Sequence, residues 1–187
     1  MRWNKKPNFV RSIRQRRASA AGFTLIELLI VIVILAISAA IVVPMASSAT
    51  SMQLRSAVNM VAADLEYAKS MAIGTGRPHS VVFDATNETY QIVRTLDDGT
   101  TTVIPHPVKK GFDYIVNFSN DGRLDRVGIV SADFDGAGTV KFDYLGSPFS
   151  VMTGKELNNT GVVTLQAGGV NKKVRVEPVT GFISISD

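Results

Sequence analysis

The chain has 187 residues, of which 45% are hydrophobic, so it is long enough for one compact domain and an additional element. It contains no cysteine, which excludes disulfide bonds, zinc–thiolate sites and thiol nucleophiles. Residues 1–22 hold seven of the 20 basic residues and no acid, which leaves 13 basic and 16 acidic residues elsewhere. The remainder therefore has a net charge of −3 instead of the overall +4, which argues against general nucleic-acid binding.

Four zones follow one another along the chain. Residues 1–22 form a basic leader, and residues 23–45 are apolar with a single charged residue, Glu27. About 20 apolar residues span a bilayer as a helix, and basic residues on the N-terminal side predict a cytoplasmic leader with the C-terminal domain outside. Residues 46–75 have the pattern of an amphipathic helix, and residues 76–187 alternate short β-like runs with turns. We expect these zones to be the domains of the protein.

Apolar residues recur at helical spacing in the third zone, with intervals of 4, 3, 4, 3 and 4. They are Leu54, Val58, Val61, Leu65, Ala68 and Ala72. Gly74, Gly76 and Pro78 then end the helix. We predict one helix from Phe23 to Ile73, whose second half places this stripe against a sheet.

The last zone predicts antiparallel strands separated by turns such as Asp84–Asn87 and Thr180-Gly181. The expected strands are 80–83, 89–94, 101–104, 114–118, 127–130, 139–144, 161–165, 174–177 and 182–185. The predicted fold class is therefore α+β: a long N-terminal helix, transmembrane in its first half, packed on an antiparallel β-sheet domain.

The junction between leader and apolar zone reads Ala-Gly-Phe-Thr-Leu-Ile-Glu-Leu-Leu over 21–29. Gly22 lets an extended backbone enter a protease site without a side-chain clash. Glu27 is a lone acid in an apolar span, where a charge costs roughly 2.5–3.5 kcal/mol at mid-bilayer on insertion scales. Cleavage after Gly22 creates a partner for it, the α-amino group of Phe23, which a neighbouring subunit can bring to Glu27.

This junction resembles the prepilin signature of type IV pilins, type II secretion pseudopilins and competence pseudopilins. The resemblance implies that prepilin peptidase cleaves after Gly22 and that Phe23 is N-methylated. It also implies that Glu27 and Phe23 carry filament assembly. Pro44 resembles the proline that kinks the helix in that family, and its missing N–H gives the physical reason. The partners implied are prepilin peptidase, other pilin or pseudopilin subunits and the inner membrane, followed by a periplasmic or extracellular filament.

The globular part resembles the GspH/FimT group of minor pseudopilins. The segments that carry this resemblance are 142–148, 161–165 and the ending 174–185, which holds a Thr-Gly turn between strands. The leader is longer than in most of the family, and the C-terminal pattern is loose.

Three other interpretations of these segments stay open. Glu27 is an acid that is tolerated near a membrane interface. The apolar span is a signal anchor that is never cleaved, or the N-terminus is a secretory signal that is cut after Ala49. Pro44 either kinks the helix or ends the membrane segment; the stripe that resumes at Leu54 favours a kink.

No motif predicts an enzyme, a cofactor or a metal site. Ser131, Asp133, Asp135 and Gly136 match four positions of a calcium loop, but Phe142 replaces its bidentate glutamate, so a polar turn is the expectation. His79 and His106 are expected to be solvated loop residues. Nucleotide-binding and serine-nucleophile motifs are missing from the sequence.

The sequence thus predicts a structural subunit of a secretion or pilus filament. The alternative is a tip subunit that binds DNA or a secreted substrate through its β domain. Lys109-Lys110 and Lys172-Lys173 with Arg175 are small basic clusters, which we interpret as solvated turns and strand edges. The sequence is consistent with a secretion, pilus or competence filament. It is equally consistent with a position at the tip or along the shaft.

Overall fold

The structure is a computed structural model that describes residues 22–187, with the side chains of 41–48 outside the description. It divides into two units, Met1–Ile41 and Val42–Asp187, which are described separately. The leader predicted at 1–22 lies outside the described residues except for Gly22. The elements are α1 (Leu25–Thr75), β1 (His79–Asp84), β2 (Thr89–Thr95), β3 (Thr101–Val103), β4 (Ile115–Asn117), β5 (Gly128–Asp133), β6 (Thr139–Phe142), β7 (Pro148–Ser150), β8 (Gly161–Ala167), β9 (Val170–Val176) and β10 (Ile183–Ser186).

The described part of the first unit, 22–40, is the beginning of α1. Its large apolar side chains are exposed along the whole segment, from Phe23 to Ile37. Within the residues described with their side chains, no helix is long and apolar enough to cross a membrane. The predicted span, 23–45, extends into residues outside that set.

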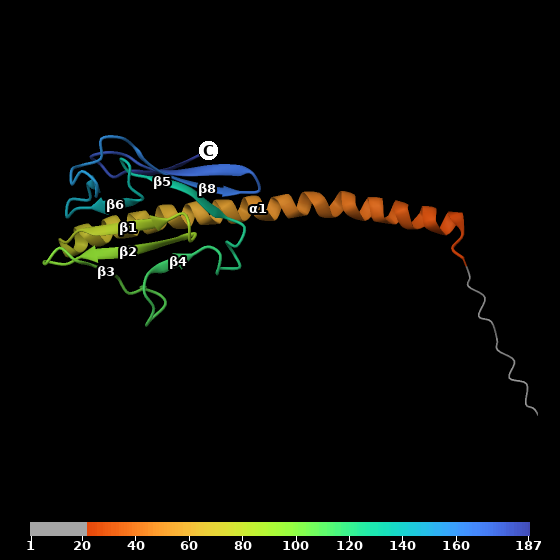
Figure 1. Cartoon of the computed structure of the whole chain (residues 1–187), viewed down its shortest axis with the longest axis horizontal. Coiled ribbons are helices and arrows are strands. Elements are labelled where there is room, and N and C mark those ends of the chain that lie inside the picture. The colour runs from red at the N-terminus through yellow and green to blue at the C-terminus, as the bar shows by residue number, and fades with distance from the viewer. Residues whose placement is uncertain (1–21) are drawn as a thin grey trace, which may run out of the picture. The chain divides into compact units, whose positions relative to one another are not determined.

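The second unit packs the C-terminal part of α1 against two antiparallel sheets (Figure 1). One sheet has the order β3-β2-β1-β6-β7, with β4 also paired to β2. The other has the order β10-β9-β8-β5. The α+β prediction of a helix packed on antiparallel sheet is confirmed.

The predicted apolar stripe of α1 is the helix face that enters the core. Leu54, Val58, Val61, Leu65, Ala68 and Ala72 are all at most 1% exposed. They belong to one continuous cluster with inward-facing side chains of both sheets, among them Val81, Tyr90, Phe142 and Leu165. At ~25 cal/mol per Å² of apolar surface buried, this stripe is a main source of the unit's stability.

Glu88 connects the two sheets. It follows the Asp84–Asn87 turn between β1 and β2, and its own φ is 54°, an uncommon backbone conformation for a residue with a side chain. Its carboxylate Oε2 accepts a hydrogen bond of 2.5 Å from the backbone N–H of Ile129 in β5. The backbone N–H of Phe118 donates to the Glu88 carbonyl at 3.0 Å. One residue of the first sheet thereby holds the start of an edge strand of the second.

Two strands differ from the prediction. β9 begins at Val170, four residues before the expected start at Val174, because Gly168 and Gly169 both adopt positive φ and form a two-residue hairpin loop after β8. β7 was missed since it is three residues long and begins with a proline. The remaining strands lie within a few residues of their predicted positions.

Candidate functional site

The predicted cleavage junction lies at the start of the described chain. Gly22 is exposed and precedes the helix, and a Cβ placed on it would meet no atom within 4 Å. Phe23 follows with 81% of its surface exposed. Both residues flanking the predicted scissile bond are therefore accessible from solvent within the described residues.

Thr24 is the N-cap of α1. Its Oγ1 accepts a hydrogen bond of 3.2 Å from the backbone N–H of Glu27, and its carbonyl accepts one of 3.2 Å from Leu28. An N-cap side chain satisfies one of the N–H groups that the first helical turn leaves free. The sequence analysis missed this role, although Thr-Leu-Ile-Glu before an apolar run is the signal of a capping box. Thr24 thereby fixes where the helix begins relative to the predicted cut.

Glu27 lies in the first turn of α1, where a negative charge is favoured by the helix dipole. Its neighbours Leu25, Ile26 and Leu28 are exposed and apolar. None of the salt bridges found among the described residues involves Glu27. Gly22, Phe23 and Glu27 thus lie at the same end of α1, and Glu27 forms no salt bridge within the part of the chain that the structure describes.

Pro44 lies within the span of α1, Leu25–Thr75. Its side chain is outside the described residues. The predicted kink at this position stays a prediction.

A buried carboxylate joins α1 to the first sheet, and the sequence analysis did not find it. Asp64 is 8% exposed and accepts hydrogen bonds from the hydroxyls of Tyr90 at 2.5 Å and Tyr114 at 2.7 Å. Burial raises the pKa of Asp64, while the two phenol donors act in the opposite direction. Burial and the nearby carboxylate likewise raise the pKa of Tyr90 and of Tyr114. This network ties α1 to β2 and to the residue that precedes β4.

The prediction that both histidines are solvated loop residues is wrong for His79. His79 is the first residue of β1 and is fully buried, because β1 pairs on both sides, with β2 and with β6. His106 lies in the loop after β3, half-buried, with its ring stacked on Tyr114 at 4.6 Å between centroids. His79 and His106 border the same pocket, although they lie far apart in the sequence.

The two acids that match calcium-loop positions accept backbone hydrogen bonds, one within the turn and one from a residue far along the chain. Asp133 Oδ1 accepts from the N–H of Gly136 at 2.7 Å, and Asp135 Oδ2 accepts from the N–H of Asn158 at 2.7 Å. The hydrogen bond from Asn158 lowers the pKa of Asp135. Among the described residues, no group of three or more potential ligands could hold a metal ion.

The basic clusters lie on separate elements. Lys109 and Lys110 are exposed in the loop before β4. Lys172 forms a salt bridge with Asp187. The expectation of a strand edge is wrong for 172–175, because β9 lies between β10 and β8 and pairs with both. Part of the predicted basic surface is thus already neutralised within the chain.

Comparison with known proteins supports the interpretation of the junction. The family described as "Prokaryotic N-terminal methylation motif" matches residues 17–43. No relative was found among curated protein sequences. The match spans Gly22, Phe23 and Glu27 and coincides with the segment on which the resemblance to prepilins rests.

The fold is similar to that of the minor pseudopilin EpsH from the type 2 secretion system of Vibrio cholerae. The TM-score is 0.53 at 9% identity, covering 72% of this chain and 96% of EpsH. The type IV minor pilin FimU of Pseudomonas aeruginosa matches at 16% identity over 73% of this chain and 90% of FimU, with a TM-score of 0.48. The chain therefore combines a fold similar to that of a minor pseudopilin with an N-terminal methylation motif.

Proposed function

We propose that the mature chain is a minor pilin-like subunit of a type II secretion or type IV pilus-type filament, produced by prepilin peptidase cleavage after Gly22. The observation that carries the proposal is the exposed junction. Gly22 and Phe23 are accessible, Thr24 starts the helix immediately afterwards, and Glu27 has no salt-bridge partner among the described residues. The match of the methylation motif to 17–43 supports the same boundary.

In this proposal the first half of α1 has two environments in succession. Before cleavage it holds the precursor in the inner membrane, with the leader cytoplasmic and the second unit outside. After cleavage it lies among the helices of other subunits in the filament. Exposed apolar side chains from Phe23 to Ile37 suit both environments, since lipid tails and neighbouring helices both cover apolar surface. Pro44 is proposed to kink α1 at its own position in the helix.

The proposed assembly contact pairs Glu27 with the N-methylated amine of Phe23 in an adjacent subunit. Both charges lose their hydration in the filament. The free-energy cost of this desolvation offsets the electrostatic attraction between them. Removal of one partner leaves an unpaired charge, which costs on the order of 3–5 kcal/mol. The pair therefore selects the correct axial position more than it adds binding energy.

Processing is tested by intact mass and N-terminal sequencing of the chain from its native membrane. We expect a chain that starts at N-methylated Phe23, and an intact precursor in cells without prepilin peptidase. Trp3 is the single tryptophan and lies in the leader, so processing also removes all tryptophan fluorescence. A chain that keeps Met1 in cells with active peptidase, or that starts near Thr50, contradicts the proposal.

Assembly is tested with Glu27→Ala, followed by filament isolation. We expect normal processing and membrane insertion but loss of incorporation into filaments. Glu66→Ala is the matched control, because Glu66 is a half-exposed acid of the same helix whose nearest cation, Lys69, is 3.9 Å away. Normal incorporation of Glu27→Ala contradicts the pairing while leaving the processing result intact.

A further inference from the structure

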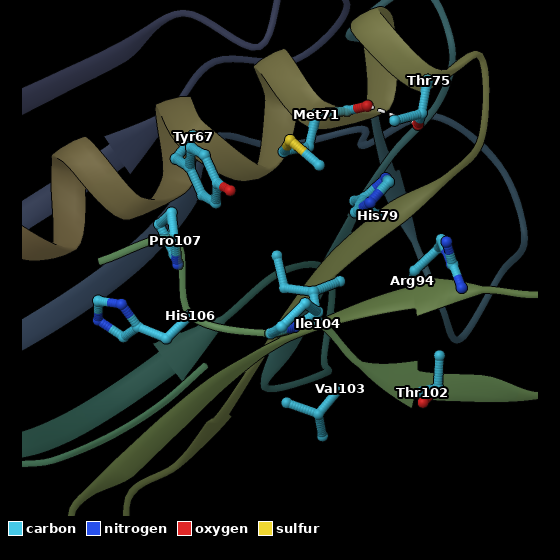
Figure 2. Close-up of a pocket in the computed structure, with 11 residues that line it drawn as sticks. Tyr67, Met71, Thr75, His79, Arg94, Thr102, Val103, Ile104, His106 and Pro107 are labelled. Carbon is cyan, nitrogen blue, oxygen red and sulfur yellow. Dashed lines mark hydrogen bonds between the residues drawn. The ribbon is translucent and has the colours of Figure 1, made fainter. Parts of the chain in front are cut away.

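A pocket of 370 Å³ lies between α1, strands β1 to β3 and the segment that follows β3. Figure 2 shows His79 and Arg94 at one end, which we call the polar end, with Tyr67, Pro107 and His106 at the other end and Ile104 between them. Pro107 is exposed, so the pocket opens to solvent. Its volume falls at the lower end of the roughly 300–1,000 Å³ that is typical of small-ligand sites.

Two polar atoms at the polar end have no hydrogen-bond partner among the residues that the structure describes. They are Nε2 of His79, whose residue is 0% exposed, and Nε of Arg94, and both atoms are buried. The salt bridges found among the described residues do not include Arg94. A buried polar atom without a partner costs about 1–3 kcal/mol, so both atoms are favourable places for a hydrogen bond from a bound group.

The two side chains can reach one ligand group because of strand register. His79 of β1 lies directly opposite Arg94 of β2. The adjacent pair is hydrogen-bonded, since the N–H of Thr95 donates to the carbonyl of Pro78 at 3.0 Å. His79 and Arg94 therefore form a non-hydrogen-bonded pair, in which Cα atoms are about 4.5 Å apart and side chains on the same face lie close together.

The hydrogen-bonding character of each atom follows from its surroundings. Nδ1 of His79 is 2.9 Å from the carbonyl of Arg77, which can only accept, so Nδ1 carries the hydrogen. Burial lowers the pKa of His79 and favours the neutral ring, which leaves Nε2 as an acceptor. The guanidinium of Arg94 offers donors and a positive charge. The complementary ligand has an anionic acceptor next to an N–H donor, with an apolar group attached.

We propose that this pocket binds the C-terminal residue of a peptide. The terminal carboxylate pairs with Arg94, and the backbone N–H of the same residue donates to Nε2 of His79. The apolar side chain of that residue lies against Tyr67 and Ile104. A peptide C-terminus carries its carboxylate and its last N–H on the same Cα atom, so one residue presents both groups to side chains that lie opposite each other on two paired strands.

The experiment uses the full chain in detergent and N-acetyl-leucine as the probe, with binding measured by calorimetry. We expect saturable binding of the acid. N-Acetyl-leucinamide, which lacks the carboxylate, and 2-acetoxy-4-methylpentanoate, which replaces the N–H with an ester oxygen, are both expected to bind at least about tenfold more weakly. N-Acetyl-glycyl-leucine tests whether the pocket takes a peptide end or a free acylated amino acid. A pocket for a peptide end binds this dipeptide as tightly as N-acetyl-leucine or more tightly. A pocket for a free acylated amino acid excludes it.

Variants test the two residues directly. Arg94→Gln is expected to weaken N-acetyl-leucine binding by at least about tenfold, and Arg94→Lys, which keeps the charge but loses Nε, by less. Arg77→Gln is the control, because Arg77 is a nearby arginine outside the pocket lining that pairs with Asp97.

Equal binding of acid, amide and ester overturns the proposal, as does the absence of binding of any probe at millimolar concentration. In that case water satisfies both atoms. The ligand series on the unchanged chain decides the matter even if a variant fails to fold.

Discussion

The described part of the first unit leaves the apolar side chains of α1 exposed, whereas the second unit buries an apolar stripe of the same helix. Leu29 and Leu65 belong to one helix, α1, yet Leu29 is 46% exposed and Leu65 is 0% exposed. The second unit covers its apolar stripe with its own sheets. The large apolar side chains of the segment 22–40 stay exposed within the described residues. Stability is a property of the second unit, and assembly is the proposed task of the first.

The largest expected effect separates these roles by a pair of identical substitutions. Leu65→Ala is expected to lower the free energy of unfolding of the second unit by about 2–5 kcal/mol, because it leaves a cavity in the core. Leu29→Ala is expected to leave that free energy unchanged. Chemical denaturation followed by circular dichroism of the processed chain measures both. Equal losses in the two variants would mean that the two parts of α1 share one core.

A second test concerns the buried carboxylate network of the second unit. Tyr90→Phe removes one of the two phenol donors to Asp64 and is expected to cost about 1–3 kcal/mol of unfolding free energy. Tyr144→Phe is the control, because Tyr144 is 59% exposed. If Tyr90→Phe costs no more than the control, then water replaces the missing donor.

A third test addresses the start of α1. Thr24→Ala removes the N-cap and is expected to cost about 1 kcal/mol of helix stability, whereas Thr24→Ser retains it. Amide hydrogen exchange at Glu27, with the chain in detergent micelles, measures the change directly. Unchanged exchange in Thr24→Ala would show that the cap does not protect the first turn.

The smallest expected effect is a pH dependence confined to the second unit. The pKa of His79 is lowered in the folded chain, so below the ordinary histidine pKa of 6.5 the unfolded chain binds more protons. Stability is therefore fully present above pH 6.5 and declines as the pH falls toward the lowered value. His79→Gln is expected to flatten the curve in this window. The raised pKa of Asp64 acts oppositely at lower pH, since stability there decreases as the pH rises above 3.8.

Much of the fold was predictable because the apolar stripe of α1 is buried along its whole length. The helical spacing of its apolar residues is therefore enough to identify the buried face. Asp64 falls on the same face, three residues after Val61, and the sequence analysis did not single it out. Its partners lie 26 and 50 residues away, and no local pattern encodes such a pairing. The beginning of β9 carried a readable signal, the Gly168-Gly169 loop, but its polar residues hid the strand.

The candidate site was predictable to a different extent. The junction at 22–27 is a contiguous motif, so sequence alone locates its residues, and the matched family covers them. The pocket beside His79 was not predictable, because strand register places His79 opposite Arg94. Nε2 of His79 and Nε of Arg94 are also buried without a hydrogen-bond partner among the described residues, and no sequence pattern signals this.

The contact between Glu88 and Ile129 also has a consequence for how copies of the chain avoid one another. β5 is an edge strand of its sheet, and an edge strand with free N–H groups is a template for a strand from a second copy. The carboxylate of Glu88 accepts a hydrogen bond from the N–H of Ile129, and the pairing register of β5 with β8 shifts between Ile129 and Ser131. A bulge and an occupied donor at consecutive positions interrupt the ladder that a second copy would extend. In the proposed filament, this edge would keep the sheet of one subunit from pairing with the sheet of another, so that association is left to the helix.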